Sequence, residues 1–275
     1  LAGRSLPPVL LCVAMAATNF SGFTIFGLSG AGYRIGYAFY PVMGFGTGFM
    51  AIALFAIGSR IRLLGAARGY VTPSDFVADR YGSPALKRLF SAVMVVATLP
   101  YIAIQAVAAG RSLESLVGLP YFAGAALVTG FVMLYVALGG LRSVAWTDVI
   151  QGAMILGFTA AAYVLIVRRS GGFVAAHDRA YAALPALFSR PGQDASMTAG
   201  AWIGYLVLWL AADPMFPQLF QKSLAARSGA GLKTTAVLYP VITTLLFFVT
   251  VSVGVLGRSV FPDLTAAESD GIFAL

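Results

Sequence analysis

Residues 139–151 read GGLRSVAWTDVIQ and join two long apolar runs. Two glycines make a tight connection, Arg142 follows them, and Asp148 is carried into the start of the second run. A carboxylate inside a membrane segment is energetically costly and usually belongs to a polar pathway. This placement predicts a membrane protein that moves something across the bilayer.

The composition excludes a soluble domain. Hydrophobic residues make up 59% of the 275 residues and charged residues 10%, and the mean hydropathy is +0.87. The uncharged windows can each hold a spanning helix, which needs about 20 apolar residues, and they lack the alternating pattern of a membrane β-barrel. We therefore expect an all-α membrane protein with seven transmembrane helices, over 6–33, 36–58, 88–112, 119–140, 143–168, 199–221 and 233–257.

The net charge of +8 reflects membrane topology. If the chain starts in the cytoplasm, more Lys and Arg residues fall on the inner side than on the outer side, with Arg4 and the bases of 60–88 among them. This is the distribution that the positive-inside rule describes. No long basic tract indicates nucleic acid as a partner. The expected partner is the lipid bilayer, and the expected location is the inner (plasma) membrane.

The sequence has few groups for covalent or metal chemistry. One cysteine, Cys12, permits no intrachain disulfide and is interpreted as a packing residue. One histidine, His177, and one cysteine form no zinc constellation. No nucleophile stands with a base, so an enzyme is not expected, and neither is a cofactor.

Two connections between the helices carry structure of their own. In the first, Ser74 is expected to cap a short helix that Gly82 and Pro84 terminate, at the cytoplasmic interface. The second, residues 169–198, is expected to be an outer loop with a short helix near 173–184. The alternative for the first is a connecting amphipathic turn, and nothing in the second indicates a separate soluble domain.

The first apolar run is weakened in its middle. Residues 16–22 read AATNFSG, and Gly27, Gly30 and Gly32 follow. A helix broken at mid-bilayer bares carbonyl groups and half-helix ends, which many secondary transporters use to bind ions and substrate. Such backbone is tolerated only where it is buried or lines a cavity. The alternative is an intact helix that packs on its neighbours through small residues.

Polar residues also lie inside later helices. Tyr101 and Gln105 are four residues apart and share a helix face, and by the same rule Asp148 and Gln151 share another. Core packing is the alternative for the first pair. For Asp148 the alternative is an ion pair with Arg142 at the start of its helix.

The sixth helix is a second candidate for a broken helix. Trp209 and Asp213 share one face, and Pro214 and Pro217 follow at once. Proline removes a backbone donor and so frees carbonyl groups within the membrane. The electrostatic expectation belongs to Asp148 on the fifth helix: a carboxylate there would attract a cation more strongly than in water, because the surroundings have a low dielectric constant.

With these residues in view, the chain resembles the sodium:solute symporter family, which includes carriers for glucose, proline, pantothenate, sialic acid and monocarboxylates. The resemblance covers nearly the whole chain. Its strongest motif runs from Gly118 through Tyr121 to YVALGGLRS at 135–143. Weaker support comes from SDF at 74–76 with RYG at 80–82, from WTD at 146–148 with Gln151, and from LAAR at 224–227.

The resemblance implies a fold of five helices followed by five more in inverted topology. Residues 6–168 would be the complete first repeat, and 199–257 would be the first two helices of an incomplete second repeat. Residues 169–198 would be the outer loop within a single transporter domain. A preceding helix and the last three core helices would lie outside this sequence, which we therefore expect to be part of a longer chain.

The resemblance also implies a cation site. Sodium would be held by the backbone carbonyls of Ala17 and Phe20, together with hydroxyl groups of an eighth core helix that this sequence lacks. Asp148 matches the acid of the family's cation path. Asn19 stands where the proline carriers have an aspartate, so a proton also remains open as the coupling ion.

The expected solute site lies just past the first break and on two further helices. Its residues, from the resemblance and from the shared helix faces, are Asn19, Ser21, Gly22, Phe23, Tyr101, Gln105, Trp209 and Asp213. Phe23 replaces a tryptophan of the proline carriers and Asp213 replaces a tyrosine. The additional acid would pair with a cationic group of a solute or titrate in proton coupling.

Three functions follow as hypotheses. The first is a cation-coupled symporter, with sodium as the expected ion, that imports a small organic solute (an amino acid, a carboxylate or a sugar) by alternating access. The second is a symporter-like sensory input module of a membrane histidine kinase. The third is a structural membrane bundle without transport, which the polar residues at mid-bilayer disfavour.

Overall fold

The computed structural model describes residues 6–273 and 275, at Leu141 and Arg142 by their backbone alone. Arg4, used for the expected orientation, lies outside the described residues. The side chain of Arg142, the alternative partner of Asp148, lies outside them as well. Over the described residues the chain is helical and forms no strand.

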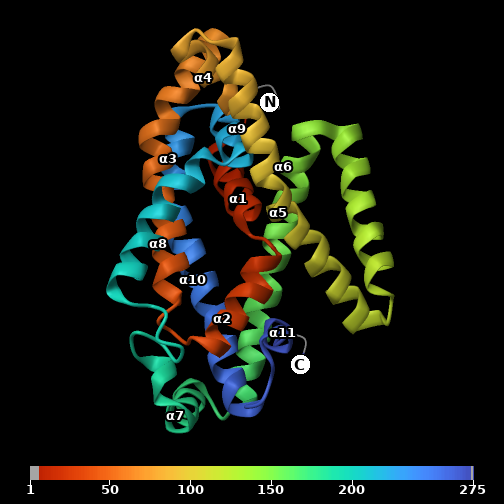
Figure 1. The fold of residues 1–275 in the computed structure, drawn as a ribbon, viewed down its shortest axis with the longest axis vertical. Helices are drawn as coiled ribbons and strands as arrows, with labels where there is room; N and C mark the ends of the chain where they lie inside the picture. Colours follow the sequence, from red (N-terminus) through yellow and green to blue (C-terminus); the bar gives the residue numbers. More distant parts are fainter. Residues whose placement is uncertain (1–5, 274) are drawn as a thin grey trace. The chain divides into compact units, whose positions relative to one another are not determined.

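The elements follow one another along the chain in Figure 1. Their bounds are α1 Pro8–Asn19, η2 Phe23–Gly27, α2 Leu28–Arg34, α3 Tyr40–Arg68, α4 Pro73–Tyr81, α5 Pro84–Val117, α6 Tyr121–Arg169, α7 Phe173–Ala183, η3 Pro185–Phe188, α8 Ala199–Ala212, η4 Asp213–Met215, α9 Pro217–Ala225, α10 Gly229–Val260 and α11 Ala266–Asp270.

Five of the described helices are long and apolar enough to cross a membrane, and the number rises to seven if two interrupted pairs each count as one span. The five are Tyr40–Arg68, Pro84–Val117, Tyr121–Gly140, Ser143–Arg169 and Gly229–Val260. These ranges match the expected positions. The helix expected over 36–58 continues to Arg68, because charged residues end the apolar segment without ending the helix.

The stretch 139–151 contains the expected glycine connection. Gly140 has φ 58° and ψ −158° between two helical parts of α6. This positive φ is readily adopted only by glycine. The second part of α6 therefore begins at Ser143 and carries Asp148 on its second turn.

The interruption of the first span is confirmed. Helix α1 ends at Asn19, Phe20 and Ser21 are not helical, and the chain resumes as the π-helix η2 before α2. The Ser21 N–H donates to Thr24 Oγ1 at 3.0 Å, and the Thr24 N–H donates to the Ser21 carbonyl at 2.9 Å. The short non-helical link is thus closed by its own hydrogen bonds.

The sixth helix is broken as well. Helix α8 ends at Ala212, η4 covers the next three residues, and α9 starts at Pro217 after the non-helical Phe216 (φ −59°, ψ 133°). Pro214 lies in the first turn of η4, and Pro217 lies in the first turn of α9. The break therefore stands where the prolines and Asp213 predicted it.

The short connecting helices are α4 and α7. Helix α7 spans Phe173–Ala183, close to the expected 173–184. Gly82 ends α4 with φ 60°, as expected. The expected cap is wrong: Thr72, not Ser74, is the N-cap residue, and its N–H donates to Asp75 Oδ2 at 2.8 Å. Ser74 is already inside the first turn and is buried.

The chain divides into two compact units. The first unit comprises the chain up to Asn19, Phe49–Gly152 and Ala211–Tyr239. The second unit comprises Phe20–Gly48, Ala153–Leu210 and Pro240–Leu275.

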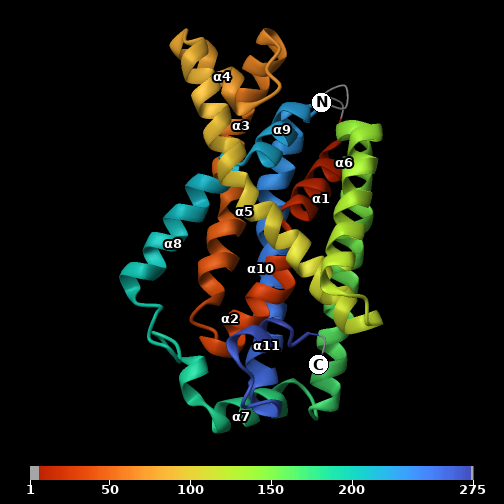
Figure 2. The same ribbon diagram turned by 45° about the vertical axis from the view of Figure 1, so that its right-hand side comes forward.

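In the first unit α1 lies beside α9, as Figure 2 shows. The Leu6 N–H donates to the Ala225 carbonyl at 3.3 Å, and the Arg227 N–H donates back to the Leu6 carbonyl at 3.2 Å. Helix α4 packs on α5. A small apolar core joins α3, α4 and α9 through Ile61, Tyr70, Phe220 and Leu224, with Phe76 and Met215 against it.

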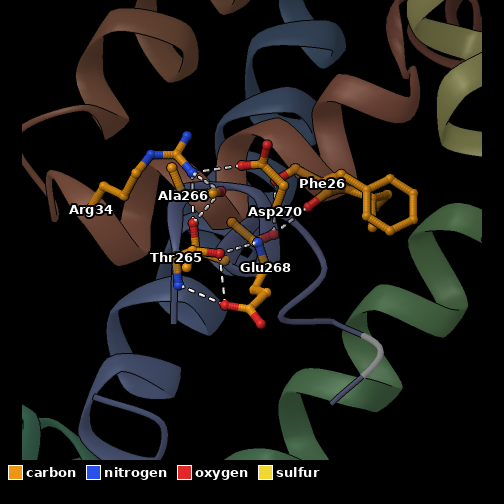
Figure 3. A network of polar contacts seen from close by, with 9 residues as sticks. Phe26, Arg34, Thr265, Ala266, Glu268 and Asp270 are labelled. Atoms are coloured by element: carbon orange, nitrogen blue, oxygen red, sulfur yellow. Dashed lines mark hydrogen bonds and ion pairs between the residues drawn. The ribbon is translucent and has the colours of Figure 1, made fainter. Parts of the chain in front are cut away.

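In the second unit α2 packs on α10 and on α11. The Arg34 guanidinium donates to the Asp270 carboxylate at 2.7 Å, to Ser269 Oγ at 2.6 Å and to the Ala266 carbonyl at 2.9 Å (Figure 3). A Cβ added to Gly254 would lie 2.6 Å from the backbone nitrogen of Tyr33. A small residue therefore does allow close helix packing here, as the alternative for the first span expected. This packing involves α2, which follows the break, so it accompanies the broken helix and does not replace it.

Candidate functional site

The broken end of α1 is the centre of the candidate site. The last four carbonyl groups of a helix have no partner within it, and they carry the partial negative charge of the helix dipole. In α1 these four groups belong to residues 16–19, which include Ala17. Among the described residues no group of three or more His, Cys, Asp or Glu side chains could hold a metal ion.

Asp148 lies against the last turns of α1. Its Oδ2 forms an ion pair with the ammonium of Lys222 and lies 3.2 Å from Thr18 Oγ1, whose single hydroxyl proton also has the Ala14 carbonyl within reach at 2.7 Å. The same ammonium donates to the Ala14 carbonyl at 2.8 Å. The side chain of Lys222 is 2% exposed and that of Asp148 is 14% exposed. We call Ala14, Thr18, Asp148 and Lys222 the ion-pair cluster.

Gly152 explains how Asp148 comes so close to α1. A Cβ added to Gly152 would lie 2.7 Å from the Cβ of Ala17. Residues four apart share a helix face, so Asp148 and Gly152 both face α1. Gln151, which was expected to share that face with Asp148, is exposed.

A second polar cluster starts at the last residue of α1. Asn19 Nδ2 donates to the hydroxyl of Tyr239 at 2.6 Å and to Asp213 Oδ2 at 3.4 Å. An amide NH₂ group has two hydrogens, so it can make both bonds. Asp213 is 1% exposed and Tyr239 is fully buried. We call these three residues the amide cluster; it joins the end of α1, the break at η4 and α10.

Tyr101 and Gln105 on α5 complete the first unit's candidate residues. The Tyr101 ring lies 6.2 Å from the ring of Phe216, measured between centroids, so it contacts the second break. Gln105 Nε2 lies 3.5 Å from the Tyr101 carbonyl of its own helix, at the limit of a hydrogen bond.

The other five predicted residues belong to the second unit. The Phe20 ring meets that of Phe247 edge to face at 6.4 Å. Gly22 has ordinary helical angles, φ −53° and ψ −33°, and the ring of Phe23 lies over Gly27 of the same π-helix. Ser21 donates its N–H within the break.

Trp209 packs on α3 within that unit. Its Cβ would lie 3.0 Å from a Cβ added to Gly46. The indole N–H is buried and has no hydrogen-bond partner among the described residues. A buried indole N–H usually finds a partner, so this group suits a donor to a bound solute.

Sequence reasoning missed Lys222, Tyr239 and Thr18. Lys222 counted only as one of the inner basic residues, although it stands five residues after Pro217 inside the second half of a broken span. Tyr239 stands directly before Pro240 in an uncharged run. Thr18 is one of the polar residues of 16–22, in the weakened middle of the first apolar run. The signal in each case was a hydrogen-bonding side chain inside an expected membrane span or directly at its end.

Comparison with known proteins shows what the chain is similar to. The model of the sodium:solute symporter family matches residues 1–270. The sodium/pantothenate symporter of Escherichia coli (strain K12) is 25% identical over 265 residues, 96% of this chain and 55% of that relative. The high-affinity proline transporter PutP of Bacillus subtilis (strain 168) is 33% identical over 171 residues, 61% of this chain and 36% of that relative.

A further relative is named for a different solute. The sodium/glucose cotransporter of Vibrio parahaemolyticus is 29% identical over 248 residues, 83% of this chain and 43% of that relative. The chain spans about half the length of the relatives it matches, or less.

Proposed function

This chain belongs to the sodium:solute symporter family, and we propose that the protein carrying it is a sodium-coupled symporter that imports a small organic solute by alternating access. The observation that carries the proposal is the interruption of the first span after Asn19, with two polar clusters at the broken end of α1. In this proposal it is a multi-pass protein of the inner (plasma) membrane. The relatives are named as a symporter, a transporter and a cotransporter, which favours transport over a sensory role.

The proposed ion site lies at the end of α1. The carbonyls of Ala17 and Phe20 would bind sodium, with Asp148 on its path. Three observations support it: the helix ends between these two carbonyls, the dipole of α1 directs negative potential to the same place, and Gly152 lets the helix of Asp148 approach closely. Sodium is the expected ion because the family is sodium-coupled.

The proposed solute site starts at the amide cluster. Asn19 and Asp213 offer an amide and a carboxylate, and Tyr101 with Phe216 offers an aromatic surface beside them. Ser21, Gly22, Phe23, Trp209 and Gln105 stay proposed solute-site residues on the family resemblance and the shared helix faces alone. The relatives are named for pantothenate, proline and glucose, which are all small organic solutes.

We also propose the five-plus-five arrangement for the helices, with 6–168 as the first repeat, 199–257 as the start of the second and 169–198 as an outer loop. The breaks support it, because they fall in the first and the sixth span. Those are the first helices of the two proposed repeats, and half-helix ends at the same place in both halves are typical of such transporters.

The test is uptake by the full-length protein in proteoliposomes. Radiolabelled proline, pantothenate, glucose and pyruvate are supplied under an inward sodium gradient, an inward proton gradient, or neither. We expect one of these solutes to accumulate above its outside concentration under the sodium gradient alone. Accumulation under the proton gradient alone would replace sodium by a proton. If no solute accumulates under either gradient, while the protein still binds one of them, the sensory role takes its place.

A further inference from the structure

The ion-pair cluster contains a cation of its own, and this step rests on the proposed function. The ammonium of Lys222 lies against Asp148 Oδ2 and the Ala14 carbonyl, with Thr18 Oγ1 beside the same carboxylate. A carboxylate, a backbone carbonyl and a hydroxyl are the oxygen ligands that hard metal cations take in proteins. The ammonium thus stands among groups that suit an alkali metal ion.

The charges of the cluster are balanced as it stands. One ammonium and one carboxylate cancel, and both are largely withdrawn from water. A free cation that joined Asp148 while Lys222 stayed would leave a net positive charge beside the ammonium. Like charges repel most strongly where water is excluded, because the dielectric constant there is low. The two cations cannot both use the carboxylate at low cost.

We propose that the Lys222 ammonium and the coupling ion bind alternately to Asp148. Lys222 holds the carboxylate in the ion-free protein, and an arriving sodium ion displaces it. Because Lys222 is on α9, directly after the second break, its release changes what anchors α9 to α1. Lys222 is thereby a positioning residue that connects ion binding to the helix next to the amide cluster.

The experiment measures binding of ²²Na⁺ to the purified full-length protein, so it needs no known solute. Lys222→Gln removes the competing charge, and we expect sodium to bind at least tenfold more tightly. Lys222→Arg keeps the charge, and its planar fork can bond a carboxylate at two points. We expect this variant to bind sodium several-fold more weakly than the unaltered protein.

Two further variants test whether the effect is specific to competition at Asp148. Lys87→Gln removes a second lysine–aspartate pair described in the first unit. In this pair Lys87 Nζ lies 2.7 Å from Asp75 Oδ1, and the side chain of Lys87 is 46% exposed. We expect it to leave sodium affinity unchanged. In an Asp148→Asn background, Lys222→Gln should no longer raise the affinity, because the object of the competition is gone.

The proposal is overturned if folded Lys222→Gln binds sodium no more tightly than the unaltered protein. A merely structural ion pair predicts that result, with lower thermal stability. Should Lys222→Gln fail to fold, Lys222→Arg decides: unchanged or tighter sodium binding contradicts the competition. Absence of sodium binding by the unaltered protein, in contrast, would count against sodium coupling itself.

Discussion

Gly254 offers a sharp test of the packing that holds α2, the second half of the broken first span. It lies where α10 meets α2, and a Cβ added there would be 2.6 Å from the Tyr33 nitrogen and closer still to the Ser29 carbonyl oxygen. Both are backbone atoms, so they cannot rotate away. Ordinary contact begins at 3.4 Å and the Tyr33 nitrogen would be at 2.6 Å, so in Gly254→Ala the two helices must move apart by about 0.8 Å or more.

Two opposing effects set the magnitude. Overpacking of a well-packed interior costs about 1–3 kcal/mol, while alanine is favoured over glycine inside a helix by about 1 kcal/mol. Gly157 on α6 isolates the second effect, because a Cβ added there meets nothing within 4 Å. Gly254→Ala should therefore be less stable than Gly157→Ala by about 1–3 kcal/mol.

The assay is thermal unfolding of the two purified full-length variants in the same detergent. At about 2–4 °C per kcal/mol, the difference in midpoint between them should be about 2–12 °C. The prediction concerns the difference, so the effect of helix propensity cancels. If Gly254→Ala melts at or above Gly157→Ala, the close approach of α2 and α10 is wrong.

Three further predictions concern single acids. Asp148→Ala should weaken sodium-dependent uptake in proteoliposomes while Asp178→Ala, an exposed acid of α7, does not; unchanged sodium dependence would remove Asp148 from the cation path. Asp213→Asn should change the preference among labelled solutes or the pH profile of uptake, and if both profiles stay the same its role is structural. Burial opposes the charge of Asp75, but bonds from Lys87 and from the backbone at Val71 and Thr72 outweigh it and hold the pKa of Asp75 below its usual value. The contribution of Asp75 to stability is therefore complete above about pH 4. It is lost as the pH falls towards the lower pKa that Asp75 has in the folded protein. Asp75→Asn should thus make the melting temperature less sensitive to acid below pH 4, as a pH series of melting curves would measure.

Where the helices lie could be predicted because each depends on local signals. The apolar runs predicted the positions of the spans, and the polar residues of the stretch 16–22 predicted the first break. Pro214 and Pro217 gave the second, because proline cannot continue the hydrogen bonding of the helix before it. Gly140 marked the connection in α6. The cap of α4 was misplaced by two residues because Thr72 and Ser74 are both good cap residues, and the choice depends on which of them Asp75 can reach.

The contacts between clusters could not be predicted, because they depend on how distant helices align. Asp148 and Lys222 are 74 residues apart, and no periodicity relates their two helices. A basic residue near the end of a span is more often solvated than buried. Only the packing of α9 on α1 shows that Lys222 lies inside the protein. The same holds for Asn19 and Tyr239, which are 220 residues apart.

The two clusters share their supporting elements, and this gives the proposed coupling a physical basis. Thr18 and Asn19 are neighbours in α1, yet the first bonds the ion-pair cluster and the second bonds the amide cluster. Across from them, the segment from η4 to α9 supplies Asp213 to one cluster and Lys222 to the other. A ligand that moves either element therefore changes both clusters. Since a coupling free energy acts equally in both directions, sodium that releases Lys222 should raise solute affinity by the same factor by which solute raises sodium affinity. Titrations of each ligand at fixed concentrations of the other, in the full-length protein, would measure both factors, and Lys222→Gln should bring both closer to one.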